Sequence, residues 1–167
     1  MKKTFLIVSF LLATVLTFAE ELTSPNGNLK LQFNLNDSGE PVYALNYKDK
    51  PVILPSKMGI EAKNVSSFLS GFVLSDVAKS SMDETWKPVW GEVSQIRNHY
   101  NEMVVTLTQP NEKNRYMKIR FRLFDDGLGF RYEFEKQPNI GYFQIKEERT
   151  QFALTGDHKT FWIPGDY

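Results

Sequence analysis

Two alternating segments joined by a tight turn constrain the fold of this chain more than any other feature. In residues 117–123 every second side chain is apolar and those between them are Lys or Arg. Residues 128–134 repeat the alternation after the turn sequence Asp125-Asp126-Gly127. A period of two is the signature of a strand with one buried face, and Gly accepts the positive φ that a tight hairpin needs. The pair predicts an antiparallel hairpin packed on a core.

The rest of the chain shows the same kind of pattern. Further strands are predicted at residues 29–35, 42–47, 52–54, 103–108, 143–145 and 161–163, with turns at 36–39 and 48–51. Residues 64–81 give mixed signals and are not assigned. No segment keeps a helical period over three turns, so the sequence predicts an all-β sandwich or barrel. With no Cys but 13 Phe, 7 Tyr and 3 Trp, the fold must be held by its core rather than by disulfides.

The N-terminus predicts export. Lys2 and Lys3 precede an uncharged apolar run that extends from Phe5 to Ala19, and two acidic residues follow it. This pattern is typical of a secretory signal peptide and is short for a membrane span, although a buried helix is an alternative. We expect cleavage after Ala19, which makes residues 1–19 the signal peptide, residues 20–167 the mature chain, and leaves no membrane span. The chain stops directly after a turn signal, so we expect it to be truncated.

Charge and composition narrow the functional classes. The formal net charge is zero and no basic block stands out, which argues against nucleic acid as a partner. Without Cys and with only two His, thiol catalysis is excluded and a His-rich metal site is not available. Glycoside hydrolysis needs two carboxylates, and Glu84, Glu92 and Glu102 are close in sequence. Their spacing does not place them across a bond, so we interpret them as solvated or salt-bridged acids and predict no catalytic residue and no metal ligand.

The segment "WKPVWGEVSQIRNHYNE", residues 86–102, concentrates groups that bind sugars. Pro88 predicts a loop or an edge strand. In an extended chain, Trp86 and Trp90 would point the same way about 13 Å apart, a spacing that suits neighbouring sugar rings. The alternative is that both indoles fill the open end of a sandwich. Arg97 and the nearby amides are either a set for binding hydroxyl groups or partners of the backbone.

Four motifs resemble glycoside hydrolase family 97: "LTSPNGNLKLQF" (22–33), "DETWKPVWGEVSQIRNHYNE" (83–102), "FRLFDDGLGFRYEF" (121–134) and "FWIPGDY" (161–167). The family includes α-glucosidases and α-galactosidases. The resemblance implies that this chain is the N-terminal antiparallel β-super-sandwich, with a mutarotase-like fold, which precedes a (β/α)₈ barrel and a C-terminal β-domain. The barrel supplies the catalytic carboxylates and most ligands of a bound calcium, and one more acidic ligand would fall just past Tyr167. No catalytic residue and no cofactor therefore carry over to this chain, while calcium is expected for the full-length parent.

The leading hypothesis is a non-catalytic N-terminal domain of an exported exo-α-glycosidase, with the catalytic barrel and an α-linked oligosaccharide as its partners. A free-standing secreted carbohydrate-binding module is the alternative, and a structural fragment with an exposed apolar face is a third. The candidate residues, either carbohydrate-binding or barrel-facing, are Trp86, Trp90, Arg97, Asn98, His99, Asn101, Glu102 and Trp162. Export and the resemblance together predict the periplasm of a Gram-negative bacterium.

Overall fold

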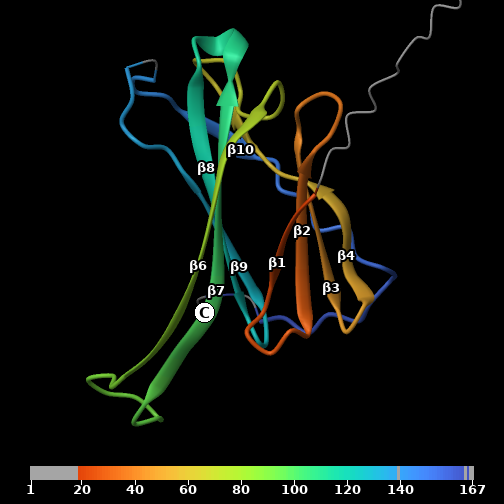
Figure 1. The fold of residues 1–167 in the computed structure, drawn as a ribbon, viewed down its shortest axis with the longest axis vertical. Coiled ribbons are helices and arrows are strands. Elements are labelled where there is room, and N and C mark those ends of the chain that lie inside the picture. The colour runs from red at the N-terminus through yellow and green to blue at the C-terminus, as the bar shows by residue number, and fades with distance from the viewer. Residues whose placement is uncertain (1–18, 139, 164, 166–167) are drawn as a thin grey trace, which may run out of the picture.

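The computed structural model describes residues 19–138, 140–163 and 165, and nearly all regular structure in them is β-strand (Figure 1). The strands are β1 (Glu20–Thr23), β2 (Leu29–Leu35), β3 (Pro41–Tyr47), β4 (Lys50–Lys57), β5 (Ile60–Ala62), β6 (Val73–Trp86), β7 (Ile96–Gln109), β8 (Arg115–Phe124), β9 (Leu128–Glu133) and β10 (Ile145–Glu148). Among these residues one 3₁₀ turn, η1 (Pro110–Glu112), is the sole helical element. The predicted all-β class is confirmed. The predicted signal peptide, residues 1–19, lies outside the described residues apart from Ala19, so it stays a prediction.

The strands form two four-stranded antiparallel sheets and one small pair. The N-terminal sheet has the order β1-β2-β3-β4, the long sheet has the order β6-β7-β8-β9, and β5 pairs with β10. In Figure 1 the N-terminal sheet (orange) and the long sheet (green to teal) lie as two layers. Neighbouring strands within each four-stranded sheet follow one another in sequence, so each sheet is an antiparallel meander.

The alternation of apolar and polar residues in the sequence indicates which face of each strand is buried. In β8 the side chains of Met117, Ile119, Phe121 and Leu123 are fully buried, whereas the Lys and Arg residues between them are partly exposed. β2 and β3 also bury every second residue along most of their length. Because successive side chains of a strand point to opposite faces, one face of each sheet is apolar and the two apolar faces meet.

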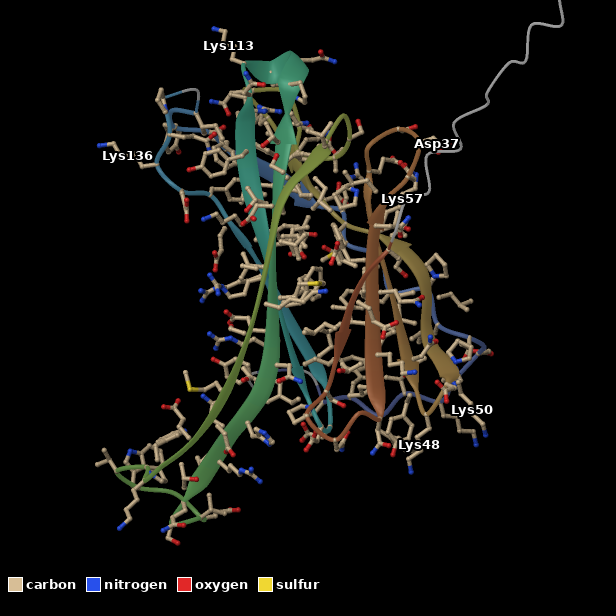
Figure 2. The ribbon with its side chains drawn as sticks, viewed as in Figure 1. Asp37, Lys48, Lys50, Lys57, Lys113 and Lys136 are labelled. Atoms are coloured by element: carbon tan, nitrogen blue, oxygen red, sulfur yellow. The ribbon has the colours of Figure 1, made fainter. Side chains whose placement is uncertain are left out.

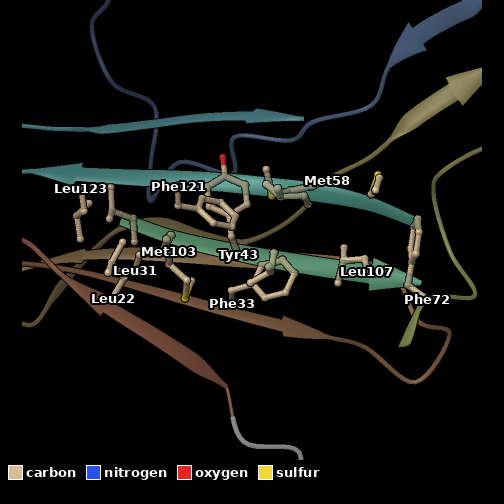
Figure 3. Packing of buried hydrophobic residues seen from close by; sticks show 14 of the residues in the cluster. Leu22, Leu31, Phe33, Tyr43, Met58, Phe72, Met103, Leu107, Phe121 and Leu123 are labelled. Carbon is tan, nitrogen blue, oxygen red and sulfur yellow. The ribbon is translucent and has the colours of Figure 1, made fainter. Parts of the chain in front are cut away.

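The core between the two layers joins residues far apart in sequence (Figure 3). Phe33 of β2 and Phe121 of β8 pack with their ring centroids 5.6 Å apart. The fully buried large side chains are Tyr43, Phe33, Phe68, Phe121, Leu31, Met58, Met103, Leu107, Met117, Ile119, Leu123 and Val105. Burying this much apolar surface is the main favourable contribution to folding in a chain without disulfides.

Two turns fix the register of the strands that they join. The predicted turn at residues 125–127 is present, and the Phe124 amide donates a hydrogen bond to the Gly127 carbonyl over 2.8 Å. Gly39 closes the turn between β2 and β3 with a φ of +67°. A Cβ at this position would lie 2.6 Å from backbone atoms of Phe72, so both the dihedral angle and the space require glycine.

Two predicted strands differ from the structure. The strand predicted at residues 143–145 is displaced, since β10 begins at Ile145 and pairs with β5. The strand predicted at 161–163 is wrong, because these residues have no regular structure and lie exposed. Residues 64–81, which the sequence does not assign, contain the first part of β6. In the described part of the chain, no helix has the length and apolarity to cross a membrane.

Candidate functional site

The segment with the sugar-binding composition forms a two-stranded arm. β6 and β7 pair from Val73–Thr108 to Trp86–Ile96, with one register shift between Leu74 and Asp76, but β8 pairs with β7 only as far as Tyr100. Residues 83–99 therefore extend past the rest of the long sheet, and residues 87–95 form the loop at the tip. Figure 1 shows this arm as the green hairpin at the lower left, away from the orange sheet. We call residues 83–99 the arm.

Both indoles of the arm are exposed. Trp86 ends β6 with 48% of its surface exposed, and Trp90 in the loop is 89% exposed. The interpretation that these indoles fill the open end of the sandwich is wrong, because the arm carries them beyond the core. Figure 2 shows the side chains at the tip of the arm standing apart from those packed between the sheets. Pro88 lies in the loop, as predicted. Residues 96–99 pair with β6 alone and so form an edge, also as predicted, whereas residues 100–102 lie between β6 and β8 in the interior of the sheet.

Polar groups of the arm pair with one another across the hairpin. Arg97 donates two hydrogen bonds to the carboxylate of Asp83, at 2.8 and 2.7 Å. Asn98 donates to Glu84 over 2.8 Å, and His99 lies directly opposite Asp83 in the pairing of β6 with β7. The Arg97 guanidinium holds the pKa of Asp83 below its usual range. These contacts stabilise the arm's geometry, and they engage the groups that the sequence suggested for sugar hydroxyls.

The next candidates along β7 have inter-strand partners. Asn101 donates a hydrogen bond to the Thr23 carbonyl at the end of β1, over 2.8 Å. Glu102 is buried and accepts hydrogen bonds from Arg120 and from Arg122, the second at 2.7 Å. Glu102 is thus salt-bridged, as expected, but it is not a surface acid.

The candidates do not form one site. Trp86, Trp90, Arg97, Asn98 and His99 share the arm, while Asn101 points to β1 and Glu102 lies in a network on the long sheet. Trp162 belongs to the C-terminal segment, where it is 75% exposed between two other exposed apolar residues. The arm therefore supplies an aromatic surface, and the C-terminal segment supplies a second one.

An arginine and glutamate network on the outer face of the long sheet is the feature that sequence reasoning missed. Arg120 donates to Glu133 over 2.6 and 3.2 Å as well as to Glu102, and Arg131 donates to Glu133 over 2.7 Å. The Arg120 hydrogen bonds, followed by that from Arg131, outweigh the effect of burial and lower the pKa of Glu133 to about 2. The available signal was the charged half of the alternation in residues 117–123 and 128–134, which the structure aligns across neighbouring strands.

The described residues contain no group of three or more His, Asp or Glu side chains placed to hold a metal ion. Glu84 accepts a hydrogen bond from Asn98 on the arm, and Glu92 is exposed in the loop. Neither is therefore placed opposite Glu102 as the second carboxylate of a catalytic pair. The chemistry that this arrangement supports is binding through exposed aromatic rings and guanidinium groups.

Comparison with known proteins identifies the family. The sequence profile "Glycosyl-hydrolase 97 N-terminal" matches residues 22–167. A retaining α-galactosidase from Bacteroides thetaiotaomicron is 27% identical over 159 residues, which cover 93% of this chain and 22% of that protein. Structures of a family 97 enzyme from Pseudoalteromonas sp. strain K8, in complexes with panose and with acarbose, share 33% identity and a TM-score of 0.76. Each match covers 81% of this chain and 20% of the enzyme.

A β-arabinopyranosidase structure, with a TM-score of 0.73 and 23% identity, shows the same fold. This chain spans about a fifth of the length of these relatives, since it covers between 20% and 22% of each. The resemblance seen in the sequence motifs is confirmed. Because the profile match extends over nearly the whole chain, this protein belongs to glycosyl hydrolase family 97 and carries that family's N-terminal domain.

Proposed function

We propose that this chain is the non-catalytic N-terminal domain, a mutarotase-like β-super-sandwich, of an exported exo-α-glycosidase. In this proposal it packs against a (β/α)₈ catalytic barrel and contributes to carbohydrate binding at the rim of the pocket. The barrel would supply the catalytic carboxylates and the calcium ligands. Family membership supports the proposal, as does the small share of each relative that the chain covers. The relative solved with panose and with acarbose supports an α-linked oligosaccharide as the substrate class.

The exposed apolar segment near the C-terminus is the observation that carries the docking role. Phe161, Trp162 and Ile163 are 95%, 75% and 90% exposed, and Phe152 and Leu154 upstream are each more than half exposed. Large apolar side chains exposed in a run of three are characteristic of a protein–protein contact. We infer that this segment faces the rest of the parent enzyme, where burial of these side chains would join the two parts.

A chimaera tests the docking role. Residues 20–167 of this chain would replace the corresponding part of the Pseudoalteromonas enzyme, and thermal unfolding and panose binding would be measured. The matched control carries Phe161→Ser, Trp162→Ser and Ile163→Ser. We expect the chimaera to unfold in one transition and to bind panose, and the control to unfold in two transitions because its sandwich no longer docks. Identical unfolding of the two proteins would contradict the proposed docking surface.

A free-standing carbohydrate-binding module remains the second candidate, and the exposure of Trp90 favours it. Aromatic rings exposed on a rigid hairpin stack well on the apolar faces of sugars. Calorimetric titration of this chain alone with panose separates the two functions. Saturable binding at millimolar sugar that Trp90→Ala removes would favour the module, whereas no binding favours a domain that needs its barrel.

The proposed location is the periplasm, and it depends on the N-terminal segment. We infer cleavage after Ala19, next to the start of β1 at Glu20. Mass spectrometry of the protein from cell fractions would give a mature chain that begins at Glu20 in the periplasmic fraction. An intact N-terminus in the cytoplasmic fraction would contradict export.

A further inference from the structure

The outer face of the long sheet carries a small hollow between β8 and β9. It has a volume of about 170 Å³. Its lining residues are Arg120, Arg122, Phe124, Gly129, Phe130 and Arg131. None of them belongs to the arm or to the C-terminal apolar segment, so the hollow is separate from the surfaces assigned above.

The pairing of β8 with β9 explains why the hollow exists. Arg120 lies opposite Arg131, and Arg122 lies opposite Gly129. Cross-strand partners point to the same face, so three guanidinium groups surround the one position that has no side chain. A Cβ built on Gly129 would meet no atom within 4 Å, and its φ lies outside the left-handed region. The backbone there would accept another residue, and the glycine leaves the space open.

The arginines at this hollow are only partly neutralised. Among the described residues, Glu102 and Glu133 are the two acids that pair with the three arginines. Arg120 uses its Nε, Nη1 and Nη2 atoms on these carboxylates, whereas Arg122 and Arg131 each donate only from Nε. Within the described residues, the Nη groups of Arg122 and Arg131 donate no hydrogen bond. One positive charge is therefore in excess, and four N–H-bearing nitrogen atoms are left to donate.

The Arg122 side of the hollow is held in place before any ligand arrives. The Arg122 guanidinium lies over the Tyr100 ring at 4.5 Å, and that ring packs on Phe124 with centroids 5.2 Å apart. Tyr100 is buried, and the side chain of Glu102 beneath the arginines is only 10% exposed. A guanidinium fixed by a carboxylate and an aromatic face loses little conformational freedom when it binds.

We propose that this hollow binds a single oxyanion, a carboxylate or a phosphate, through the free Nη groups of Arg122 and Arg131. Guanidinium groups pair with such anions through parallel, charge-assisted hydrogen bonds. The volume is below that of pockets for whole drug-sized ligands, so it suits one charged group rather than a sugar chain. The site goes beyond the proposed function, since a neutral α-linked oligosaccharide has no group that requires it.

Titration followed by NMR of the arginine side chains tests the proposal with the intact protein. The probes are inorganic phosphate, glucuronate as a carboxylate carried on a sugar, and glucose as the neutral control. We expect saturable shifts of the Nε–H signals of Arg122 and Arg131 with either or both anions, and none with glucose. Shifts with phosphate alone would identify a free anion as the ligand source, and shifts with glucuronate alone would identify an acidic sugar. If neither phosphate nor glucuronate causes saturable shifts, the proposal is overturned.

Variants separate a built site from general electrostatic attraction. Gly129→Val fills the hollow and leaves every charge in place. Arg122→Gln, which removes one donor group, is the second variant and is used if the valine variant does not fold. We expect each to weaken anion binding about tenfold or more, the loss expected for a charge-assisted hydrogen bond. Arg97→Gln removes the same charge from the arm and should leave the affinity unchanged. Wild-type affinity in Gly129→Val, or an equal loss in Arg97→Gln, would refute the site.

Discussion

The side-chain amide of Asn101 on β7 donates a hydrogen bond to the main-chain carbonyl of Thr23 on β1, with 2.8 Å between Nδ2 and O. This bond joins a strand of the long sheet to the first strand of the N-terminal sheet. The two residues are 78 positions apart in sequence, so the contact exists only in the folded state. An amide that the sequence offered for a sugar hydroxyl thus ties together the two layers of the sandwich.

The first prediction concerns this bond. Asn101→Ala should lower the free energy of unfolding by about 1 kcal/mol, because a partly buried carbonyl loses its donor. The matched control is Asn98→Ala, which removes an amide bonded to exposed Glu84 on the arm and should cost less than about 0.5 kcal/mol. Urea denaturation of the two variants measures the difference. Equal losses would mean that the Asn101 bond contributes nothing specific to holding the layers together.

The second prediction concerns the buried carboxylate of Glu102. Glu102→Gln removes the charge that both Arg120 and Arg122 face, and we expect a loss of about 2 kcal/mol. This is less than for a fully buried pair because both arginines keep some solvent exposure. Glu135→Gln is the control, since its pair with Lys118 is exposed and should contribute about 0.5 kcal/mol or less. Denaturant unfolding with an unchanged m value measures the loss in both variants. A smaller loss in Glu102→Gln than in Glu135→Gln would contradict the predicted order.

The third prediction is a dependence of stability on pH that comes from Glu133. Its pKa is lowered from 4.5 to about 2 in the folded protein, chiefly by hydrogen bonds from Arg120. Below the unfolded-state pKa the unfolded chain binds more protons than the folded protein. The stabilisation is therefore fully present above about pH 4.5 and is lost as the pH falls towards 2.

The Glu133→Gln variant lacks the carboxyl group that causes this dependence on pH. Between about pH 5 and pH 2 we expect the wild type to lose on the order of 2 kcal/mol more stability than the variant. Other acids with lowered pKa values, such as Asp83 and Glu61, titrate in both proteins and cancel in the comparison. The measurement is urea unfolding at several pH values, and parallel curves for the two proteins would rule out Glu133 as the source.

The strands that face the core were predictable from sequence because burial of one face leaves a period of two. Residues 117–123 and 29–35 alternate clearly and became β8 and β2, which supply Phe121 and Phe33 to the core. The turn at 125–127 was equally readable, since its glycine and aspartates have a direct conformational reason to be there. These features depend only on neighbouring residues.

The features that were missed depend on distant residues or on exposure. β6 is an edge strand with nearly every residue exposed, so it shows no alternation and the length of the arm could not be predicted. The apolar run at 161–163 looked like a strand although these side chains are exposed and unpaired with any described strand. The cluster of arginines arises from the register of β7, β8 and β9, which residue patterns within one strand do not fix.

The last prediction separates the arm from the core. Trp90 is 89% exposed, so Trp90→Ala should change the free energy of unfolding by less than about 0.5 kcal/mol. Phe121 is fully buried against Phe33, and Phe121→Ala should cost about 3 to 5 kcal/mol because it leaves a cavity between the sheets. Urea unfolding followed by circular dichroism measures both variants on the same scale. A loss of more than about 2 kcal/mol in Trp90→Ala would contradict the separation of the arm from the core, since an exposed side chain has too few contacts to account for it.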